Sequence, residues 1–299
     1  MSKETEQQQE QKRLAEAFPE KPQNLSQAIN TATRDLHDIV NHLIVQRFML
    51  GLRDYRLYRE GILSFYHVYS AFERTWAHLL ANASLVKPHI YTALQALSDP
   101  RLTRAPAIAL DLTYLYDAQR FDPDAPADAN SVRGECVAHI EKVLLEKPHL
   151  LLAYAHNYYM ALFAGGKMLL RQILMAKDFF PVKAPAGDSD EAKAFSTNMF
   201  VFPVETGKEE SLRAKFKAAM ELAEENLSEE EKTEIIQESR HIYQMNERLV
   251  RELDEICGSL AIPAAQLDRA NETLSFVAQY KLLLILVAVT TLSVLRYYL

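Results

Sequence analysis

Four polar residues near the N-terminus have the types and the spacing of a ligand-binding helix face. Asn30, Arg34, His37 and Asn41 follow one another at intervals of four, three and four residues, which places them on one face of an α-helix. The imidazole of His37 is the group in this row that can ligate a metal ion or the iron of a haem. The same spacing also fits a histidine with an ordinary core or surface role. His37 is therefore a candidate ligand for a metal ion or a haem.

Gly165 and Gly166 are adjacent inside an apolar run, residues 150–175, that otherwise has the composition of one buried helix. Glycine inside a helix costs about 0.5–1 kcal/mol relative to alanine. Such a pair indicates a backbone that bends, or one against which a flat ligand lies directly. A large planar ligand satisfies the second condition.

Two other sets of potential metal ligands are predicted to bind no metal. Glu238 and His241 have the Glu-x-x-His spacing of di-iron helical bundles. That site needs a second such pair on a facing helix, and because no predicted helix holds one, we interpret the spacing as coincidental. The two cysteines, Cys136 and Cys257, belong to no Cys-x-x-Cys motif and are predicted to be free thiols in a reducing compartment.

The composition predicts an all-α protein with no nucleic-acid partner. The 299 residues are 48% hydrophobic and 24% charged, which is enough to bury a full core. Glycine is scarce, alternating β-branched runs are nearly absent, and amphipathic stretches rich in Leu, Ala, Glu, Lys and Arg recur. The net charge of −7, with no long basic stripe to offset it, argues against binding to nucleic acid.

Cap and turn signals divide the chain into helices. A helix cap is predicted at Asn24 and a capping box at residues 228–231. Loops are predicted at 123–131 and 181–190, where proline recurs. The predicted helices cover residues 25–48, 54–81, a segment that starts near 87, 105–118, 132–145, 149–177, 209–226 and 228–257. We expect them to pack as one helical domain over residues 23–260.

The two ends of the chain differ in composition. Residues 1–22 form a polar arm, rich in Gln, Glu and Lys, that is predicted to be disordered and is not a secretory signal. Residues 261–279 are predicted to be a polar tether and residues 280–299 a transmembrane tail anchor. A helix from 282 to 299 would reach about 27 Å at about 1.5 Å per residue, enough for a thin bilayer. The alternative is a buried terminal helix.

Three blocks of the sequence resemble successive blocks of the haem oxygenases. They read LSQAINTATRDLH at 25–37, FYHVYSAFE at 65–73 and YAHNYYMALFAGGK at 154–167, in the order and spacing of that family. Weaker blocks follow at 213–217, which reads RAKFK, and at 238–253. A C-terminal tail anchor is also what eukaryotic members carry. The chain is thus similar to a divergent, fungal-like, tail-anchored haem oxygenase.

The resemblance implies an all-helical domain that holds haem between a proximal and a distal helix. His37 falls on the proximal iron ligand. Gly165 and Gly166 fall on the distal bend, whose backbone approaches the porphyrin face. Haem in this family is both cofactor and substrate, and its ring is opened to biliverdin with release of carbon monoxide and iron.

Five further residues acquire roles from the resemblance. Arg34 and Lys217 fall on positions that pair with the haem propionates, where a cation can neutralise a carboxylate. Tyr69 and Tyr243 fall on pocket-lining aromatic positions, and Asn246 falls on the distal polar network. An ordinary surface or core role is the alternative for each of the five.

The chain also departs from the family pattern. Leu162 stands where the family has an acidic residue that holds a distal water and steers the reaction toward hydroxylation of the ring. Asn30 replaces a lysine, Asn41 replaces the glutamate that hydrogen-bonds the proximal histidine, and Glu221 replaces a propionate-binding arginine. These changes leave fewer cations to bind the propionates and give the proximal histidine a weaker hydrogen-bond acceptor.

Two functions are compatible with these observations. In the first, the chain is a haem oxygenase in which His156, Asn157 or Tyr158 orders the distal water, with electrons from an NADPH-dependent flavoprotein reductase on the same membrane. In the second, it holds haem without opening the ring, as a sensor, carrier or peroxidase-like relative. We expect it at the endoplasmic reticulum membrane, facing the cytosol, or alternatively at the outer mitochondrial membrane.

Overall fold

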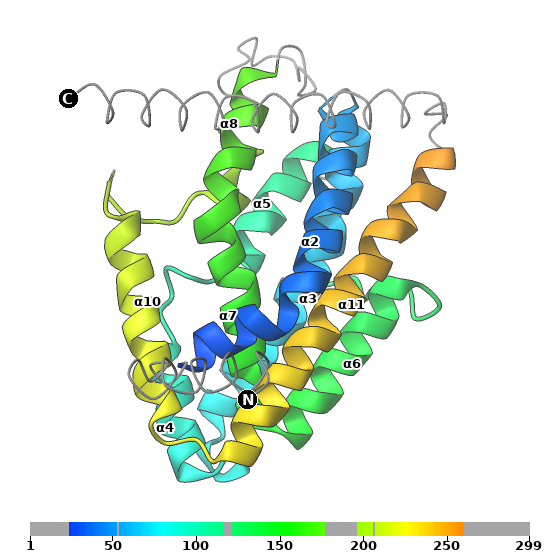
Figure 1. The fold of residues 1–299 in the computed structure, drawn as a ribbon. Coiled ribbons are helices and arrows are strands. Elements are labelled where there is room, and N and C mark those ends of the chain that lie inside the picture. Colours follow the sequence, from blue (N-terminus) through cyan, green and yellow to red (C-terminus); the bar gives the residue numbers. More distant parts are fainter. Residues whose placement is uncertain (1–23, 53, 117–120, 177–195, 206, 260–299) are drawn as a thin grey trace, which may run out of the picture.

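A computed structural model describes residues 24–52, 54–116, 121–176, 196–205 and 207–259, all drawn in colour in Figure 1. These residues form helices and connecting turns, as the composition predicts. The α-helices are α2 (Leu25–Gly51), α3 (Tyr55–Ala81), α4 (Pro88–Leu97), α5 (Ala105–Tyr116), α6 (Val132–Glu146), α7 (Leu151–Ala161), α8 (Lys167–Met175), α10 (Glu209–Glu224) and α11 (Glu229–Ser259). Short helical turns are η1 (Ala83–Leu85), η2 (Pro148–Leu150), η3 (Leu162–Gly166) and η4 (Asn198–Phe200).

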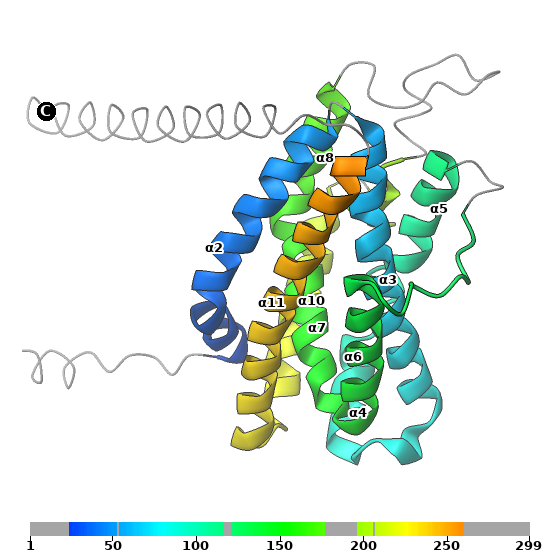
Figure 2. The ribbon, with the colours of Figure 1, turned by 90° about the vertical axis from the view of Figure 1, so that its right-hand side faces the viewer.

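Helix α7 lies at the centre of the bundle, and its residues from Leu151 to Tyr159 are all buried. Helices α2 and α11 pack side by side, α3 packs against α5 and α6, and α10 packs against α4 (Figures 1 and 2). Because α11 packs against both α2 and α7, residues far apart in the sequence share one interior.

The observed helices follow the predicted ones except at two places. The helix predicted over 149–177 is divided, because η2, α7, η3 and α8 follow one another from Pro148 to Met175. The helix predicted over 105–118 is observed over Ala105–Tyr116, and its last two positions lie outside the described residues.

Both predicted helix caps are confirmed. The side chain of Asn24 accepts a hydrogen bond from the Gln27 backbone N–H, and the Gln27 side chain accepts one from the Asn24 N–H. Ser228 and Glu231 make the same reciprocal pair at distances of 3.2 and 3.0 Å. Each pair satisfies two amides that the first turn of a helix leaves without partners.

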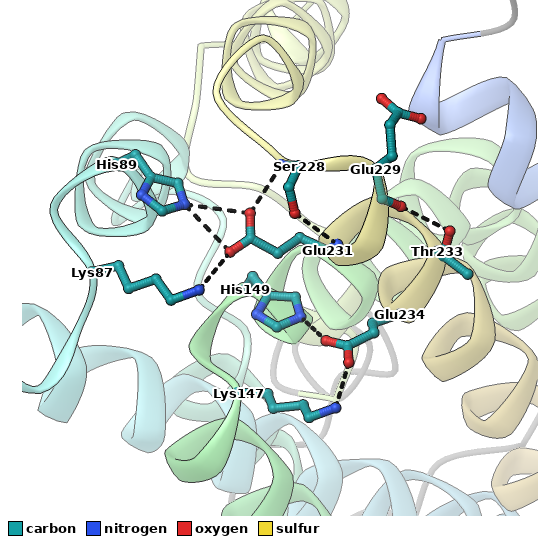
Figure 3. Close-up of polar contacts among 9 residues, drawn as sticks. All are labelled: Lys87, His89, Lys147, His149, Ser228, Glu229, Glu231, Thr233 and Glu234. Atoms are coloured by element: carbon teal, nitrogen blue, oxygen red, sulfur yellow. Dashed lines mark hydrogen bonds and ion pairs between the residues drawn. The ribbon is translucent and has the colours of Figure 1, made fainter.

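A repeated tripeptide holds the first two turns of α11 (Figure 3). Lys-Pro-His occurs at residues 87–89 and again at 147–149. The first copy donates to Glu231, from its lysine at 3.1 Å and its histidine at 3.3 Å. The second copy donates to Glu234 in the same way, with its histidine 2.7 Å away. Helix α11 is thereby fixed at its N-terminal end to the segments that begin α4 and η2.

Replacing Glu231 by glutamine is expected to lower the free energy of unfolding at pH 7 by about 1–2 kcal/mol. Burial alone would raise the pKa of Glu231, but hydrogen bonds from Ser228, Lys87 and His89 outweigh it and hold the pKa at about 2, below its ordinary 4.5. The stabilisation is therefore present above pH 4.5 and is lost as the pH falls toward 2. Urea unfolding of the wild type and of Glu231→Gln, at pH 7 and at pH values from 4.5 down to 2, measures this difference in the free energy of unfolding.

The matched control for this experiment is Glu229→Gln in the same turn. The Glu229 carboxylate is exposed and pairs with Lys232, while the Glu229 backbone carbonyl accepts a hydrogen bond from Thr233. Equal acid sensitivity in Glu231→Gln and Glu229→Gln would contradict the role given to Glu231.

The predicted segments at the two ends lie outside the described residues. This applies to the polar arm at 1–22, the tether at 261–279 and the tail anchor at 280–299. Among the helices that are described, none combines the length and the apolar character needed to cross a bilayer.

Candidate functional site

The glycine pair lies in a widened, π-helical turn, η3, that joins α7 to α8. Backbone dihedrals at the start and end of the turn stay right-handed, with φ −66° and ψ −43° at Leu162 and φ −57° and ψ −40° at Gly166. A Cβ added at Gly165 would meet no atom within 4 Å, and one added at Gly166 would make only ordinary contacts of 3.6 Å. The protein's own packing therefore does not require glycine here. Turns of this kind are frequent at functional sites.

Beside η3 lies a cavity of about 410 Å³, within the range of cofactor sites. It is formed by α2, α3, α7, η3, α8, η4 and α11, and most of its lining is apolar. Among the predicted site residues it contains His37, Tyr69, Gly165, Gly166, Tyr243 and Asn246. The cavity thus combines an imidazole, open space beside a bare backbone, and an apolar wall, which together fit a large planar ligand that carries a metal.

His37 projects from α2 with 56% of its side chain exposed. Its Nδ1 atom lies 3.3 Å from Asp38 Oδ1, and its ring meets the ring of Tyr243 edge-on at 5.9 Å. Asp38 therefore supplies a carboxylate acceptor of the kind that Asn41 cannot supply. A hydrogen bond from Nδ1 leaves Nε2 as the ligating nitrogen.

Three predicted residues form the polar part of the lining. Asn246 is buried and accepts a hydrogen bond from the Tyr158 hydroxyl at 2.8 Å, and the Tyr69 hydroxyl donates to the carbonyl of Tyr158 at 3.1 Å. Tyr243 is half-buried and hydrogen-bonds with Thr33. Helices α3, α7 and α11 are thus joined by hydrogen bonds at the cavity wall.

Arg34 and Lys217 are both exposed and do not line the cavity in the described part of the chain. The structure describes no ion pair for either side chain. Asn30 and Glu221 are likewise exposed and lie outside the lining. The polar row on α2 therefore contributes His37 and Asn41 to the cavity, but not its first two members.

The replacement at position 162 places an apolar side chain in the lining, since Leu162 is only 7% exposed. Of the three residues predicted to compensate, Asn157 and Tyr158 line the cavity and His156 does not. Asn157 donates to the carbonyl of Ala153 at 2.8 Å and to Ser239 at 3.0 Å. Its carbonyl oxygen and the Tyr158–Asn246 pair are the groups that can hold a water here.

Burial sets the protonation of these groups. It raises the pKa of the Tyr58, Tyr69 and Tyr158 phenols, so they stay protonated and act as donors. Burial also lowers the pKa of His156 to about 4, so this imidazole is neutral at pH 7. The lining near η3 is therefore uncharged but rich in hydrogen-bonding groups.

Arg47 is a charged lining residue that the sequence analysis did not identify. It is 8% exposed and pairs with Asp254, with Nη2 to Oδ2 at 2.6 Å and Nε to Oδ1 at 3.1 Å. Its spacing from His37 continues the stripe on α2, through Ile44, at steps of three to four residues. Arg47, neutralised by Asp254, thus lies in the lining near the C-terminal end of α2.

The turn η4 supplies another part of the lining through Met199 and Phe200. Asp111, fully buried on α5, accepts hydrogen bonds from the backbone N–H groups of Asn198 and Met199, each at 2.8 Å. Burial raises the pKa of this carboxyl to about 7. Asp111 thus holds the turn that places Phe200 beside Gly166.

No cluster of three or more His, Cys, Asp or Glu residues suited to a metal ion occurs among the described residues. Glu238 instead accepts hydrogen bonds from His139 and Tyr154.

Fold and site together define an all-helical bundle whose interior cavity is lined by a histidine on the first described helix and by a glycine turn in a central one. The chain belongs to the haem oxygenase family, since the sequence model of that family, described as "Heme oxygenase", matches residues 23–252. The predicted family resemblance is therefore confirmed.

Relatives and solved structures agree with this membership. "Heme-binding protein HMX1" of Saccharomyces cerevisiae is 28% identical over 243 residues, which cover 78% of this chain and 76% of the relative. "Heme oxygenase" of Guillardia theta is 29% identical over 147 residues, 49% of this chain and 57% of the relative. The fold matches heme oxygenase-2 from Synechocystis sp. PCC 6803 in complex with heme and NO, with TM-score 0.63, 20% identity, and coverage of 84% and 93% of the two chains.

Proposed function

We propose that the chain binds haem in the cavity and cleaves its ring oxidatively to biliverdin, carbon monoxide and iron, using O2. One observation carries the proposal: His37 and the glycine turn η3 line the same apolar cavity, and the space beside Gly165 is open. The solved Synechocystis relative holds heme, and the yeast relative is named for heme binding, which supports the same ligand here.

Each residue has a defined task in this proposal. His37 ligates the iron, and Asp38 fixes the imidazole orientation through Nδ1. Gly165 and Gly166 allow the backbone to approach the ring. The Tyr158–Asn246 pair orders a water on the distal side. Bound haem supplies the oxygen chemistry itself.

In this proposal Arg34 and Lys217 bind the two propionates, as the family resemblance implies. Both are exposed cations, and the structure describes no ion pair that they would have to break. Electrons come from NADPH through a flavoprotein reductase, and residues 280–299 anchor the chain in the endoplasmic reticulum membrane.

The test uses the full chain, titrated with haemin and then supplied with an NADPH-driven flavoprotein reductase in air. We expect a Soret band to form with one haemin per chain, and then to decay as biliverdin and carbon monoxide appear. Absence of a Soret band would exclude haem binding. A Soret band that persists without biliverdin would exclude ring cleavage alone.

A second candidate function is haem binding without ring opening, as in a sensor, carrier or peroxidase-like protein. Leu162 favours it, because an isobutyl group cannot hold the distal water that an acidic residue holds in the family.

Leu162→Asp separates the two functions. If Asn157, Tyr158 and Asn246 already order the distal water, we expect the variant to form biliverdin no faster than the wild type. We also expect its free energy of unfolding to fall by about 1–3 kcal/mol, because the site is buried. Biliverdin formation and urea unfolding are the measurements.

Leu162→Asn is the matched control, since it has the same shape without the charge. A large gain of biliverdin formation in Leu162→Asp but not in Leu162→Asn would favour the second function.

A further inference from the structure

A buried tyrosine outside the cavity has a built proton acceptor. Tyr154 on α7 is fully buried, and its hydroxyl donates to Glu238 Oε1 at 2.6 Å. The same oxygen lies 3.0 Å from His139 Nε2, and the His139 side chain is 29% exposed. His241 packs against His139 with 4.3 Å between ring centroids. The phenol is therefore linked to the surface through a carboxylate and an imidazole.

Tyr154 is also linked to the cavity. Tyr158 follows it by one helical turn, and their rings stack with 6.3 Å between centroids and 24° between planes. Phe72 lies against both rings, at 6.1 Å from Tyr154 and 5.7 Å from Tyr158. Tyr158 lines the cavity itself. An unbroken aromatic stack thus runs from the cavity wall to Tyr154.

The two phenols differ in what can take their proton. The Tyr158 hydroxyl donates to the amide oxygen of Asn246, which is not a base. The Tyr154 hydroxyl donates to a carboxylate. Burial alone would raise the pKa of Glu238, but the hydrogen bonds from His139 and Tyr154 hold that pKa below its ordinary value, so the group is ionised. Because an oxidised phenol is a strong acid, this carboxylate accepts its proton.

We propose that Tyr154 is a redox-active tyrosine that passes single electrons, through Tyr158, to haem bound in the cavity after that haem has been oxidised by a peroxide. The activity is peroxidase-like and goes beyond ring cleavage, but it rests on the haem binding proposed above. Oxidation of Tyr154 is favoured over that of Tyr158 because, of these two phenols, Tyr154 donates to a carboxylate and Tyr158 to an amide oxygen.

Each oxidation of Tyr154 moves one electron and one proton. Tyr154 loses one electron to the cavity and its hydroxyl proton to Glu238, which leaves a neutral tyrosyl radical. A small phenol or an ascorbate-class reductant at the surface returns the electron, and the proton moves back from Glu238. Two such cycles reduce one hydrogen peroxide to two water molecules, with both protons and both electrons supplied by two reductant molecules.

The experiment adds hydrogen peroxide to the haemin-loaded full chain without reductant and records electron paramagnetic resonance spectra after rapid freezing. We expect a radical signal that narrows when the protein contains ring-deuterated tyrosine. The signal is lost in Tyr154→Phe, which keeps the ring and its packing, and is weakened in Glu238→Gln, which keeps an acceptor that cannot be protonated. The Soret band after haemin loading stays unchanged in both variants.

Tyr91→Phe is the matched control, because Tyr91 donates its hydroxyl to the carbonyl of Leu80 and is not in the cavity lining. A signal that survives in Tyr154→Phe, or one that is lost only in Cys136→Ser, would overturn the proposal. Cys136 is included because it is a buried thiol on α6 near the same rings.

A second arm oxidises the haem-free chain with a photoexcited ruthenium complex and persulfate. The tyrosyl radical is expected to persist longer in the wild type than in Tyr154→Phe. Absence of a Soret band in the first arm would mean that the proposed haem binding fails, whereas equal radical lifetimes in the second arm would mean that Tyr154 has no special redox role.

Discussion

His37→Ala is expected to reduce biliverdin formation by more than about 100-fold, because loss of even an outer-shell partner of a metal ligand costs 10–100-fold. The imidazole of His37 is 56% exposed and packs edge-on against Tyr243, so its removal leaves the core of the bundle intact. The haemin titration should show a weaker complex with an altered Soret band. Added imidazole should restore that band, because alanine leaves space for a free imidazole in the same place.

The control is His42→Ala on the same helix. His42 is exposed, hydrogen-bonds with Gln46 at 2.6 Å, and does not line the cavity. This variant removes an imidazole from α2 but keeps His37, the proposed iron ligand. An unchanged Soret band in His37→Ala, or equal losses in the two variants, would remove His37 from the site.

Periodicity alone identifies the functional face of α2 but not the part of that face that meets the ligand. The stripe from Asn30 to Asn41 is on one side of the helix, yet the part of α2 that lines the cavity begins at His37 and continues to Phe48. Which part of this face lines the cavity depends on the other helices that pack against α2. Arg47 is acceptable inside because Asp254, 207 residues later, neutralises it, and no local pattern reports such a partner.

The same reasoning applies to the contacts of the two Lys-Pro-His copies with α11. The two Lys-Pro-His copies are visible in the sequence, but a tripeptide repeat has meaning only when its partners are known. Glu231 and Glu234 lie three residues apart on one helix, so they present two carboxylates to two separate segments. The capping box at Ser228 was predictable because all of its atoms come from four consecutive residues.

The glycine pair was predictable because adjacent glycines lower the stability of a helix, and this effect can be read from the local sequence. Two glycines in an apolar helix are unfavourable unless something offsets them, and the structure places them in a π-helical turn at a cavity wall. Periodicity does not give the turn itself, because a helix period of 3.6 residues describes regular segments only.

Gly165→Ala and Gly165→Leu are expected to move stability and ligand binding in opposite directions. A Cβ at Gly165 meets no atom within 4 Å, so alanine should raise the free energy of unfolding of the haem-free chain by about 0.5–1 kcal/mol. In the proposed complex with haem, the ring takes the same space. Overpacking by leucine should cost about 1–3 kcal/mol of binding, or a roughly 5- to 150-fold higher dissociation constant for haemin.

Urea unfolding of the haem-free variants and haemin titration of the same samples measure the two effects separately. Gly165→Ala and Gly165→Leu form a size series, so the affinity should fall with side-chain volume while the stability of the haem-free chain does not. The reason is that a glycine retained at a net cost to the helix must be retained for a contact that the haem-free chain does not make. If leucine binds haemin as tightly as glycine does, the open space at η3 is not where the ligand lies, and the cavity must hold it against α2 and α11 alone.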